Sequence, residues 1–525
     1  MPHHIDYTQS VPRPPRSLDP PRLLIIGAGS RGNAYARAIT HSSNGEVVAV
    51  AEPVKFKRQQ LGRKYIWGEK TPAEGQEFPD WKSFLTWEQA RRARVATGDE
   101  APTGVDGFLV CTLDESHAEI ITALAPLGLH LLSEKPLATT LEDCLSIYAS
   151  LLPKGPFTGP PCLFAMGHVL RYSPHNMLLR KLLLDDGVIG EVISMEHTEP
   201  VGWWHFAHSY VRGNWRREDA TAPSLLTKSC HDIDLLLWLL CSPPLAADSP
   251  HLPSFIISTG SLKHFRRSQK PEAAGRATNC LSCPAEPECP YSARKIYQSR
   301  LRDGDIGFPI KIVVPEVEAI VVEDGVSAAE TLLMERLAED YGHEPAGLNR
   351  RPYYGRCVYE AGNDVCDDQV VTITWEDDAT EGVQGRRHAR TGKTATFHMI
   401  AFTEQVCQRR SRIYGAKGEM EADSTTIKVH DFATGQTTTH HPHQAGGGHG
   451  GGDDGLARQF VLAIDAVKNQ GMSVVEAQQT HIRCTLDDVI RSHAVVFAAE
   501  EARKGRKVVD WPEWWRTKVD AHLPR

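Results

Sequence analysis

The fold is decided by the stretch Leu23-Leu24-Ile25-Ile26-Gly27-Ala28-Gly29-Ser30-Arg31-Gly32, in which a short apolar run ends in glycines spaced G-x-G-x-x-G. This pattern predicts a buried strand, a tight turn at Gly27, close approach of a pyrophosphate at Gly29, and close strand–helix packing at Gly32. A helix expected over 33–40 then points its N-terminal amides at the phosphates. The stretch therefore predicts a dinucleotide site, with Ser30 and Arg31 on the same turn.

A second apolar run, Val47-Val48-Ala49-Val50-Ala51, ends in Glu52, about 20 residues after the glycines. A carboxylate at that position accepts hydrogen bonds from the adenine ribose and repels a 2′-phosphate. We therefore expect NAD as the cofactor. NADP is the alternative, because Lys55, Lys57 and Arg58 follow and would recruit the extra phosphate if Glu52 turned away.

Two further apolar runs, at 107–112 and 129–132, are expected to be neighbouring strands of the same parallel sheet. In a doubly wound sheet, ligands bind beyond the carboxyl ends of the strands. The first run delivers Thr112 and His117 to that edge, and the second delivers Glu134 and Lys135. We expect all four residues near the cofactor.

The ordered set of motifs resembles the Gfo/Idh/MocA oxidoreductase family. The motifs that give this resemblance are Gly27 to Gly32, Thr112 with His117, Glu134-Lys135-Pro136, Gly167 to Pro174, Gly213-Asn214-Trp215, His231-Asp232-Ile233-Asp234, and Arg412 to Glu419. The resemblance implies an α/β protein with an N-terminal Rossmann domain and a C-terminal α/β domain built on an open mixed, largely antiparallel sheet. It also implies NAD(P)-linked redox chemistry on a sugar, cyclitol or related polyol, and a homo-oligomer formed through the open sheet face.

The domain organisation is predicted from composition shifts. We expect a disordered tail over 1–21, a Rossmann domain over 22–170 and a substrate domain over 171–525, with an insertion at about 242–353. The formal charge of -8 argues against a nucleic-acid partner. No apolar run approaches the roughly 20 residues of a membrane span. Twelve cysteines without a scaffold-like spacing favour a reducing, cytoplasmic setting.

Dehydrogenation of an alcohol needs a base for the hydroxyl proton and a cation that stabilises the developing alkoxide. Lys135 and His231 are the candidates, as the resemblance also implies. Several relatives carry an aspartate four residues before this histidine, where the present chain has Thr227. Asp232, Asp234 and Lys228 are the possible replacements.

Substrate contacts are expected from the polar and aromatic stretch at 202–210, in particular Trp204, and from Arg171 and Tyr172. Lys228 is a second cation that would hold an acidic substrate, and Asp234 is a further polar candidate. His449 belongs to a His/Gly-rich stretch, His449-Gly450-Gly451-Gly452-Asp453. That stretch is similar to one in NAD-dependent α-N-acetylgalactosaminidases, relatives of the same fold.

The insertion contains Cys280, Cys283 and Cys289, spaced C-x₂-C-x₅-C. Three thiolates and a fourth nitrogen or sulfur ligand would close a tetrahedral structural zinc site. Cys357, His264 and Cys366 are the candidates for the fourth ligand. The alternative interpretation is a loop of reduced cysteines held by prolines.

Three functions remain open at this point. The favoured one is a net dehydrogenase or reductase acting on a carbohydrate-like small molecule. The second is an NAD-dependent glycosidase that works by transient oxidation and elimination, with His449 near the sugar ring. The third, a non-catalytic cofactor sensor, does not explain Lys135.

Overall fold

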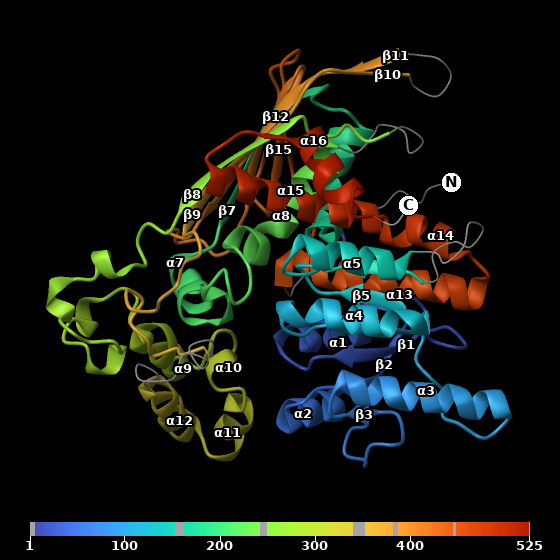
Figure 1. Ribbon diagram of the computed structural model, residues 1–525, viewed down its shortest axis with the longest axis vertical. Coiled ribbons are helices and arrows are strands. Elements are labelled where there is room, and N and C mark those ends of the chain that lie inside the picture. The colour runs from blue at the N-terminus through green and yellow to red at the C-terminus, as the bar shows by residue number, and fades with distance from the viewer. Residues whose placement is uncertain are drawn as a thin grey trace.

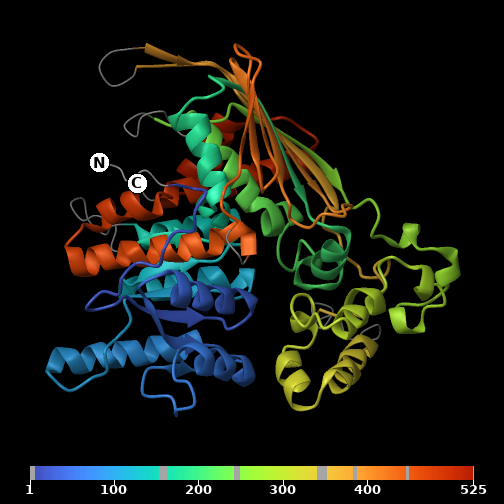
Figure 2. The same ribbon diagram turned by 180° about the vertical axis from the view of Figure 1, so that it is seen from behind.

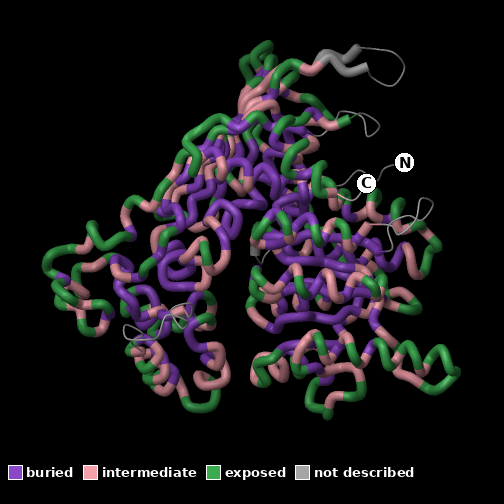
Figure 3. The backbone as a smooth tube through the Cα atoms, viewed as in Figure 1, coloured by how far each residue is buried: buried purple, intermediate pink, exposed green. Residues whose placement is uncertain are grey.

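The computed structural model describes residues 6–152, 162–241, 249–339, 352–381, 387–444 and 448–523. Two large sheets organise the fold (Figure 1), and one continuous cluster of buried hydrophobic residues runs through both (Figure 3). The first is a six-stranded parallel sheet in the order β3-β2-β1-β4-β5-β6. Its strands are β1 Arg22–Ile26, β2 Glu46–Ala51, β3 Glu77–Phe78, β4 Gly107–Val110, β5 His130–Ser133 and β6 Phe164–Met166.

Helices connect these strands in the alternating pattern of a Rossmann domain: α1 Ser30–Ser42, α2 Lys55–Tyr65, α3 Trp81–Thr97, α4 His117–Leu124 and α5 Leu141–Leu151. The central strands read as continuous apolar runs because both of their faces are covered. β1 and β4 are buried along almost their whole length. The fold class expected from the sequence is confirmed for this half of the protein.

The second sheet has nine strands in the order β16-β15-β14-β13-β7-β12-β9-β8-β17. Among its pairs only β7 with β12 is parallel, so the sheet is mixed and largely antiparallel, as expected. Its strands are β7 Val192–Pro200, β8 Phe255–Ser261, β9 Asp368–Trp375, β12 Lys393–Ile400, β13 Arg410–Gly415, β14 Gly418–Ala422, β15 Ile427–Asp431, β16 Thr437–His440 and β17 Val509–Asp510. A separate hairpin pairs β10 Asp378–Glu381 with β11 Arg387–Arg390.

Side chains alternate between buried and partly exposed along β9 and β12, which is the pattern of a sheet covered on one face. Two helices cover the buried face, α8 Ser224–Leu240 and α15 Leu486–Gly505 (Figures 1 and 2). This arrangement turns His197 and Glu199 of β7 toward α8, while Glu196 and Thr198 face outward.

The C-terminal helices return to the first domain. α13 Gly452–Gln470 packs along α1, so the N-terminal domain is completed by residues from the far end of the chain (Figure 1). Residues 6–21, expected as a disordered tail, contain no helix or strand, and Arg13 and Ser17 bond to Ser43 and Asp465. The boundary expected at residue 170 therefore separates two domains that share elements.

The C-terminal residues 474–505 do not form one continuous helix. α14 Val474–Ala477 continues as a π-turn over 478–482 and stops at Arg483, which has a left-handed φ of 57°. A new helix, α15, then starts with a capping box formed by Thr485 and Asp488. Because both segments are apolar on one face, the periodicity alone did not show the break.

The insertion lies between β8 and β9 and forms a lobe of short helices beside α2 (Figures 1 and 2). We call residues 262–367 the insertion lobe. Its helices are α9 Ser299–Arg302, α10 Ile310–Val313, α11 Val317–Glu323 and α12 Val326–Ala338. Among the described residues, no helix has both the length and the apolarity that crossing a membrane would require.

Candidate active site

The glycine turn after β1 has three different environments. Gly27 has a φ of 95°, and a Cβ there would lie 2.5 Å from the carbonyl oxygen of Cys111. A Cβ on Gly32 would lie 1.9 Å from the carbonyl oxygen of Gly27, whereas a Cβ on Gly29 would meet no atom within 4 Å. The turn is thus closed against the sheet at two positions and open at the third, where α1 begins. An anion at Gly29 would face the N-terminus of this helix.

Glu52 is buried at the end of β2 and faces the same turn. Its carboxylate accepts N–H groups from Ala28 and Val54, both at 2.8 Å. Each carboxylate oxygen can accept a second hydrogen bond, so ribose hydroxyls can still bind here. Arg58 is held elsewhere, by Glu77 at 2.8 Å and by the Glu52 carbonyl at 2.6 Å. Lys57 has no ion pair among the described residues.

A cavity of about 630 Å³ opens in front of the glycine turn. One wall is the Rossmann domain, with Gly29, Asn33 and Lys57, and the opposite wall is the insertion lobe. This volume is within the range of cofactor and ligand pockets. The lobe side is lined by Phe308, Lys311, Ile312, Val313, Pro315, Glu316, Glu318, Arg336, Glu339, Pro352, Tyr353 and Tyr354.

Arg31, Glu134 and Asp453 form a chain of charges at the edge of the sheet. Arg31 Nε lies 2.7 Å from Glu134, and Arg31 Nη2 lies 2.7 Å from Asp453 in the first turn of α13. Burial alone would raise the pKa of both carboxyls, but the Arg31 charge holds the pKa of each below its usual value. Arg31 and Glu134 therefore bind each other and join α13 to the cofactor domain.

His117 and Thr112 connect two loops at this edge. His117 is fully buried, with Nδ1 at 2.8 Å from the Pro136 carbonyl and Nε2 at 3.4 Å from the Thr112 carbonyl. The Thr112 hydroxyl accepts a hydrogen bond from Ser116 at 2.8 Å. His117 thus fixes the loop that carries Lys135.

Lys135 is half-buried and lies between the two domains. Its ammonium donates to the carbonyl of Thr227 in α8, one helical turn before His231. The Trp215 ring lies 5.8 Å from Nζ, and Trp215 Nε1 donates to Asp114 at 2.8 Å. Burial raises the pKa of Asp114, and the nearby Lys135 and His117 partly offset this. The two predicted catalytic residues are therefore brought to the same turn of α8.

His231 is buried, with one ring nitrogen held and the other free. Nε2 lies 2.7 Å from Arg409 Nη2 and 3.3 Å from Asp232 Oδ2, whereas Nδ1 has no partner among the described residues. Burial, reinforced by the Arg409 charge, lowers the pKa of His231 well below its usual value. The imidazole is therefore neutral at neutral pH.

Asp232 takes the position beside His231 that the sequence left open. It also contacts His197 at 3.2 Å and Arg409 at 2.5 Å. Burial would raise the pKa of Asp232, but Arg409 and the two histidines hold it well below its usual value. Thr227 contributes its carbonyl oxygen to the Lys135 ammonium.

Lys228 points into the second domain. It pairs with Glu199 at 3.0 Å and contacts Cys407 Sγ at 3.0 Å, and Arg409 pairs with the same glutamate at 3.0 Å. Burial disfavours the charged form of Lys228, yet the Cys407 and Glu199 interactions raise its pKa above the usual value. Its ammonium is thus balanced within the protein.

Three other expected substrate residues are used in packing. Arg171 forms a two-point ion pair with Asp234, at 2.7 and 2.8 Å, and both side chains are buried. Tyr172 donates to the Ile482 carbonyl at 2.7 Å. These bonds attach the turn at 169–172 to α8 and to the C-terminal segment, and they commit the Asp234 carboxylate and the Tyr172 hydroxyl within the protein.

Trp204 and His449 have different surroundings. Trp204 packs against Phe308, with ring centroids 5.8 Å apart, and under Arg300 at 4.0 Å. It therefore joins the second domain to the insertion lobe. His449 lies 6.0 Å from His231, ring to ring, and its Nδ1 is 3.3 Å from Asp453. Position 452, at the start of α13, has no room for a side chain, because a Cβ on Gly452 would lie 2.2 Å from the Val169 carbonyl oxygen.

The cysteines of the insertion lobe lie together. Cys280, Cys283, Cys289 and Cys357 line one cavity of about 200 Å³. Neither of the other two candidate ligands lines this cavity: His264 bonds to Tyr359 at 3.2 Å, and Cys366 is buried elsewhere.

A second group of metal-ligand types, His168, Cys230 and His493, is buried under the first domain, with ligand atoms within 4.8 Å of one another. His493 accepts the Leu137 N–H at 2.9 Å on one nitrogen and contacts the Val489 carbonyl at 2.8 Å with the other. Both of its nitrogens are therefore committed to the backbone.

Sequence reasoning missed Arg409, Glu199, Asp114 and Asp453 as site residues. Arg409 lies in a short connection before β13, and Glu199 is one polar residue in an alternating strand. Their importance arises from tertiary contacts between β7, α8 and β13. For Asp453 a signal existed, since it ends the His/Gly-rich stretch.

Comparison with known proteins supports the interpretation of the first domain as a dinucleotide-binding Rossmann domain. Residues 22–155 match the family described as "Oxidoreductase family, NAD-binding Rossmann fold". Inositol 2-dehydrogenase of Rhizobium meliloti (strain 1021) is 26% identical over 174 residues, which cover 33% of this chain and 42% of the relative. Inositol 2-dehydrogenase/D-chiro-inositol 3-dehydrogenase of Halalkalibacterium halodurans is 27% identical over 222 residues, which cover 42% and 52%. The alignments thus span about half the length of these curated relatives.

Solved structures extend the likeness of the fold to both domains. An inositol dehydrogenase homolog complexed with NAD+ from Azotobacter vinelandii has a TM-score of 0.57 at 12% identity, covering 97% of this chain and 100% of its own. Levoglucosan dehydrogenase in complex with NADH and levoglucosan has a TM-score of 0.56 at 15% identity, covering 94% and 99%. At these identities the structures support the fold alone. The sequence matches show that residues 22–155 carry the NAD-binding Rossmann domain of the Gfo/Idh/MocA oxidoreductases.

Proposed function

We propose that the protein is an NAD-dependent oxidoreductase that moves a hydride between the nicotinamide and a CH–OH carbon of a sugar, cyclitol or related polyol. One observation carries the proposal: Lys135, at the carboxyl edge of the parallel sheet, reaches the turn of α8 that bears His231. The named activities of the inositol dehydrogenase relatives support the substrate class.

The residues of the first domain fit a dinucleotide. The open position at Gly29 gives room for a pyrophosphate against the start of α1, and Glu52 presents a carboxylate beside that turn. When bound, NAD supplies the acceptor for the hydride. Glu52 favours NAD over NADP, because the 2′-phosphate of NADP would face a buried carboxylate.

His231 and Lys135 divide the handling of the hydroxyl group. Because Arg409 can only donate to Nε2, the neutral imidazole carries its hydrogen on Nδ1, the nitrogen without a protein partner among the described residues, and donates it to the substrate oxygen. Lys135 then acts as the base: its amine accepts the hydroxyl proton, and the resulting ammonium stabilises the negative charge that develops on the oxygen. Asp232 and Arg409 hold the imidazole in place, and the ion pairs around them exclude water from this wall of the site.

A panel of polyols, sugars and aryl glycosides tests this function. The purified protein is mixed with each compound and NAD, and the reduced nicotinamide band is followed together with released aglycone. NADH in proportion to the oxidised polyol is the expected result. If the protein binds NAD but none of the compounds yields NADH, the proposal is contradicted.

A second candidate function is an NAD-dependent glycosidase that oxidises, eliminates, adds water and reduces in one cycle. The observation that favours it is His449, 6.0 Å from His231 and in contact with Asp453. A further ring nitrogen beside the site would serve as an additional acid or base. Aglycone released without net NADH would select this function over the first.

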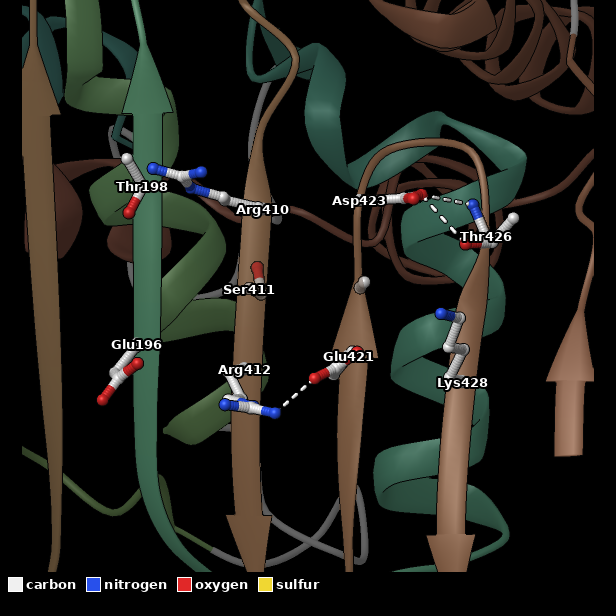
Figure 4. A pocket seen from close by; sticks show the side chains of 10 residues that line it. Glu196, Thr198, Arg410, Ser411, Arg412, Glu421, Asp423, Thr426 and Lys428 are labelled. Atoms are coloured by element: carbon white, nitrogen blue, oxygen red, sulfur yellow. Dashed lines mark hydrogen bonds and ion pairs between the residues drawn. The ribbon is translucent and has the colours of Figure 1, made fainter. Parts of the chain in front are cut away.

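We propose that the protein forms a homo-oligomer through the outer face of the nine-stranded sheet and works in the reducing cytoplasm. The sheet face carries a polar hollow of about 320 Å³ between β7, β13, β14 and β15, with Arg412 paired to Glu421 (Figure 4). All twelve cysteines are free. Light scattering during gel filtration measures the oligomeric state, and a monomer would contradict this assignment.

The structural zinc expected from the cysteines is a separate proposal, independent of the redox chemistry.

A further inference from the structure

Four of the five cysteines of the insertion lobe, Cys280, Cys283, Cys289 and Cys357, come from two separate segments that a backbone bridge brings side by side. Asn279 and Arg356 form an isolated antiparallel bridge. Around it, the Cys280 N–H donates to the Gly355 carbonyl at 2.8 Å, and the Cys357 N–H donates to the Thr278 carbonyl at 2.7 Å. Cys280 and Cys357 are therefore diagonal neighbours across the bridge, and tight turns after Cys280 and at 286–289 return Cys283 and Cys289 to the same cavity.

Arg212 borders this cavity with a charge that no acidic side chain balances. Its side chain is 0% exposed, and it has no ion pair with a carboxylate among the described residues. Nε and Nη2 donate to the carbonyls of Arg356 and Tyr291, both at 2.7 Å, and Nη2 also lies 3.3 Å from Cys280 Sγ. Within the part of the chain that the structure describes, Nη1 has no hydrogen-bond partner. A buried cation without a counter-charge is costly, so this site calls for negative charge.

Backbone amides already point at two of the sulfurs. Burial raises the pKa of the Cys289 and Cys357 thiols, and the backbone amides of Tyr291 and Tyr359 act in the opposite direction on the two sulfurs. In both cases the donor is two residues after the cysteine. Hydrogen bonds of this kind favour a negatively charged sulfur, because an N–H donor stabilises a thiolate more than a thiol.

We propose that Cys280, Cys283, Cys289 and Cys357 bind one zinc ion as four thiolates, and that this centre is the counter-charge of Arg212. Four thiolates and Zn²⁺ carry a net charge of about -2, which the buried guanidinium offsets in part. Binding releases the four thiol protons to solvent, and no oxidant or reductant takes part. With four protein ligands the ion is structural, since no position remains for water or substrate.

Zinc binding requires the thiol side chains to turn inward. No three of the four sulfurs lie within 4.8 Å of one another in the described structure, whereas Zn–S bonds are about 2.3 Å long. Rotation about the Cα–Cβ bonds brings sulfurs into the cavity that these same residues line. Such a site would join the short turns at 280–283 and 286–289 to the segment around Cys357.

Metal analysis of the full-length protein purified without chelator tests the proposal. We expect about one zinc per chain, released when a mercurial reagent blocks the thiols. Cobalt(II) substituted for zinc should give the visible bands of tetrahedral cobalt and a sulfur-to-cobalt charge-transfer band. Zinc-free, folded protein with four alkylatable thiols in the lobe would overturn the proposal, and so would disulfides among these four cysteines.

Variants separate the centre from other cysteines. Cys357→Ser should lose zinc or bind it much more weakly, whereas Cys366→Ser, which changes a buried cysteine outside the cavity, should keep it. Arg212→Gln removes the counter-charge without touching a ligand and should weaken zinc binding by about 10- to 100-fold. Unchanged affinity in Arg212→Gln would refute the counter-charge role. If Cys357→Ser fails to fold, the zinc content and cobalt spectrum of the unaltered protein still decide whether the centre exists.

Discussion

Arg409 is the residue whose replacement tests the architecture of the site most sharply. It pairs with two fully buried carboxylates, Asp232 at 2.5 Å and Glu199 at 3.0 Å, and donates to His231 at 2.7 Å. Methionine keeps the length of the side chain and removes the charge. Glu199 would keep Lys228 at 3.0 Å, whereas Asp232 would keep only neighbouring histidines.

The expected cost follows from this difference. Breaking a buried ion pair by removing one partner destabilises a protein by about 3–5 kcal/mol. Because Glu199 retains a cation, we expect Arg409→Met to lower the free energy of unfolding by about 3 kcal/mol, near the low end. His231 also loses a group that fixes its ring, and kcat should fall by as much as about 100-fold. Arg409→Lys keeps a positive charge but loses the planar guanidinium, so its free energy of unfolding and its kcat should lie between those of Arg409→Met and of the unaltered protein.

Urea unfolding at one fixed NAD concentration, followed by fluorescence and far-UV circular dichroism, measures this effect. A double-mutant cycle with Asp232→Asn isolates the pair, because the double variant no longer leaves a lone buried charge. We expect it to be more stable than the sum of the single changes predicts, by about 1–3 kcal/mol. Additive losses, or an Arg409→Met protein as stable as the unaltered one, would refute the reasoning.

Three further outcomes follow from the same geometry. Lys135→Ala should reduce kcat by about 10²- to 10⁴-fold while changing the NAD dissociation constant little, and turnover close to normal would remove Lys135 from catalysis. Glu52→Ala should weaken NAD by about tenfold and relax discrimination against NADP in cofactor titrations; unchanged selectivity would show that Glu52 does not contact the ribose. Burial lowers the pKa of His208 and of His493 to about 3, while the unfolded chain takes up these protons near pH 6.5. The unfolded state therefore binds more protons between these values, and stability should fall as pH drops below about 6.5, by up to about 1.4 kcal/mol per histidine per pH unit. A flat profile in pH-dependent unfolding would contradict the neutral state of these residues.

The parallel sheet and its cofactor turn could be predicted because their signals are local. Leu23 to Ile26 form a fully apolar run, and the G-x-G-x-x-G spacing of the glycines after it is read directly from the sequence. The position of Lys135 followed similarly, since it comes directly after a buried strand. The helix break at Arg483 could not be predicted, because the apolar face continues on both sides and only the cap at Thr485 marks the new start.

The substrate side depended on contacts that no local pattern reveals. Arg171 and Asp234 had the right chemistry for a substrate, but they are 63 residues apart and satisfy each other in the fold. Asp232 was one of three possible partners for His231, and Arg409, which selects it, comes from a connection without periodicity. The four cysteines could be grouped from the sequence, whereas a role for Arg212 could be recognised only from its buried position beside Cys280.

The central claim is that this site removes hydrogen from a CH–OH carbon and passes it to NAD. Its most direct test is isotope transfer: a polyol that yields NADH in the panel is labelled with deuterium at the carbon to be oxidised, and the reduced nicotinamide is isolated. We expect one deuterium per reduced nicotinamide from the unaltered protein, and the same label in a far smaller yield of reduced nicotinamide from Lys135→Ala in the same time. Unlabelled NADH, or label that exchanges into water before it reaches the cofactor, would contradict it.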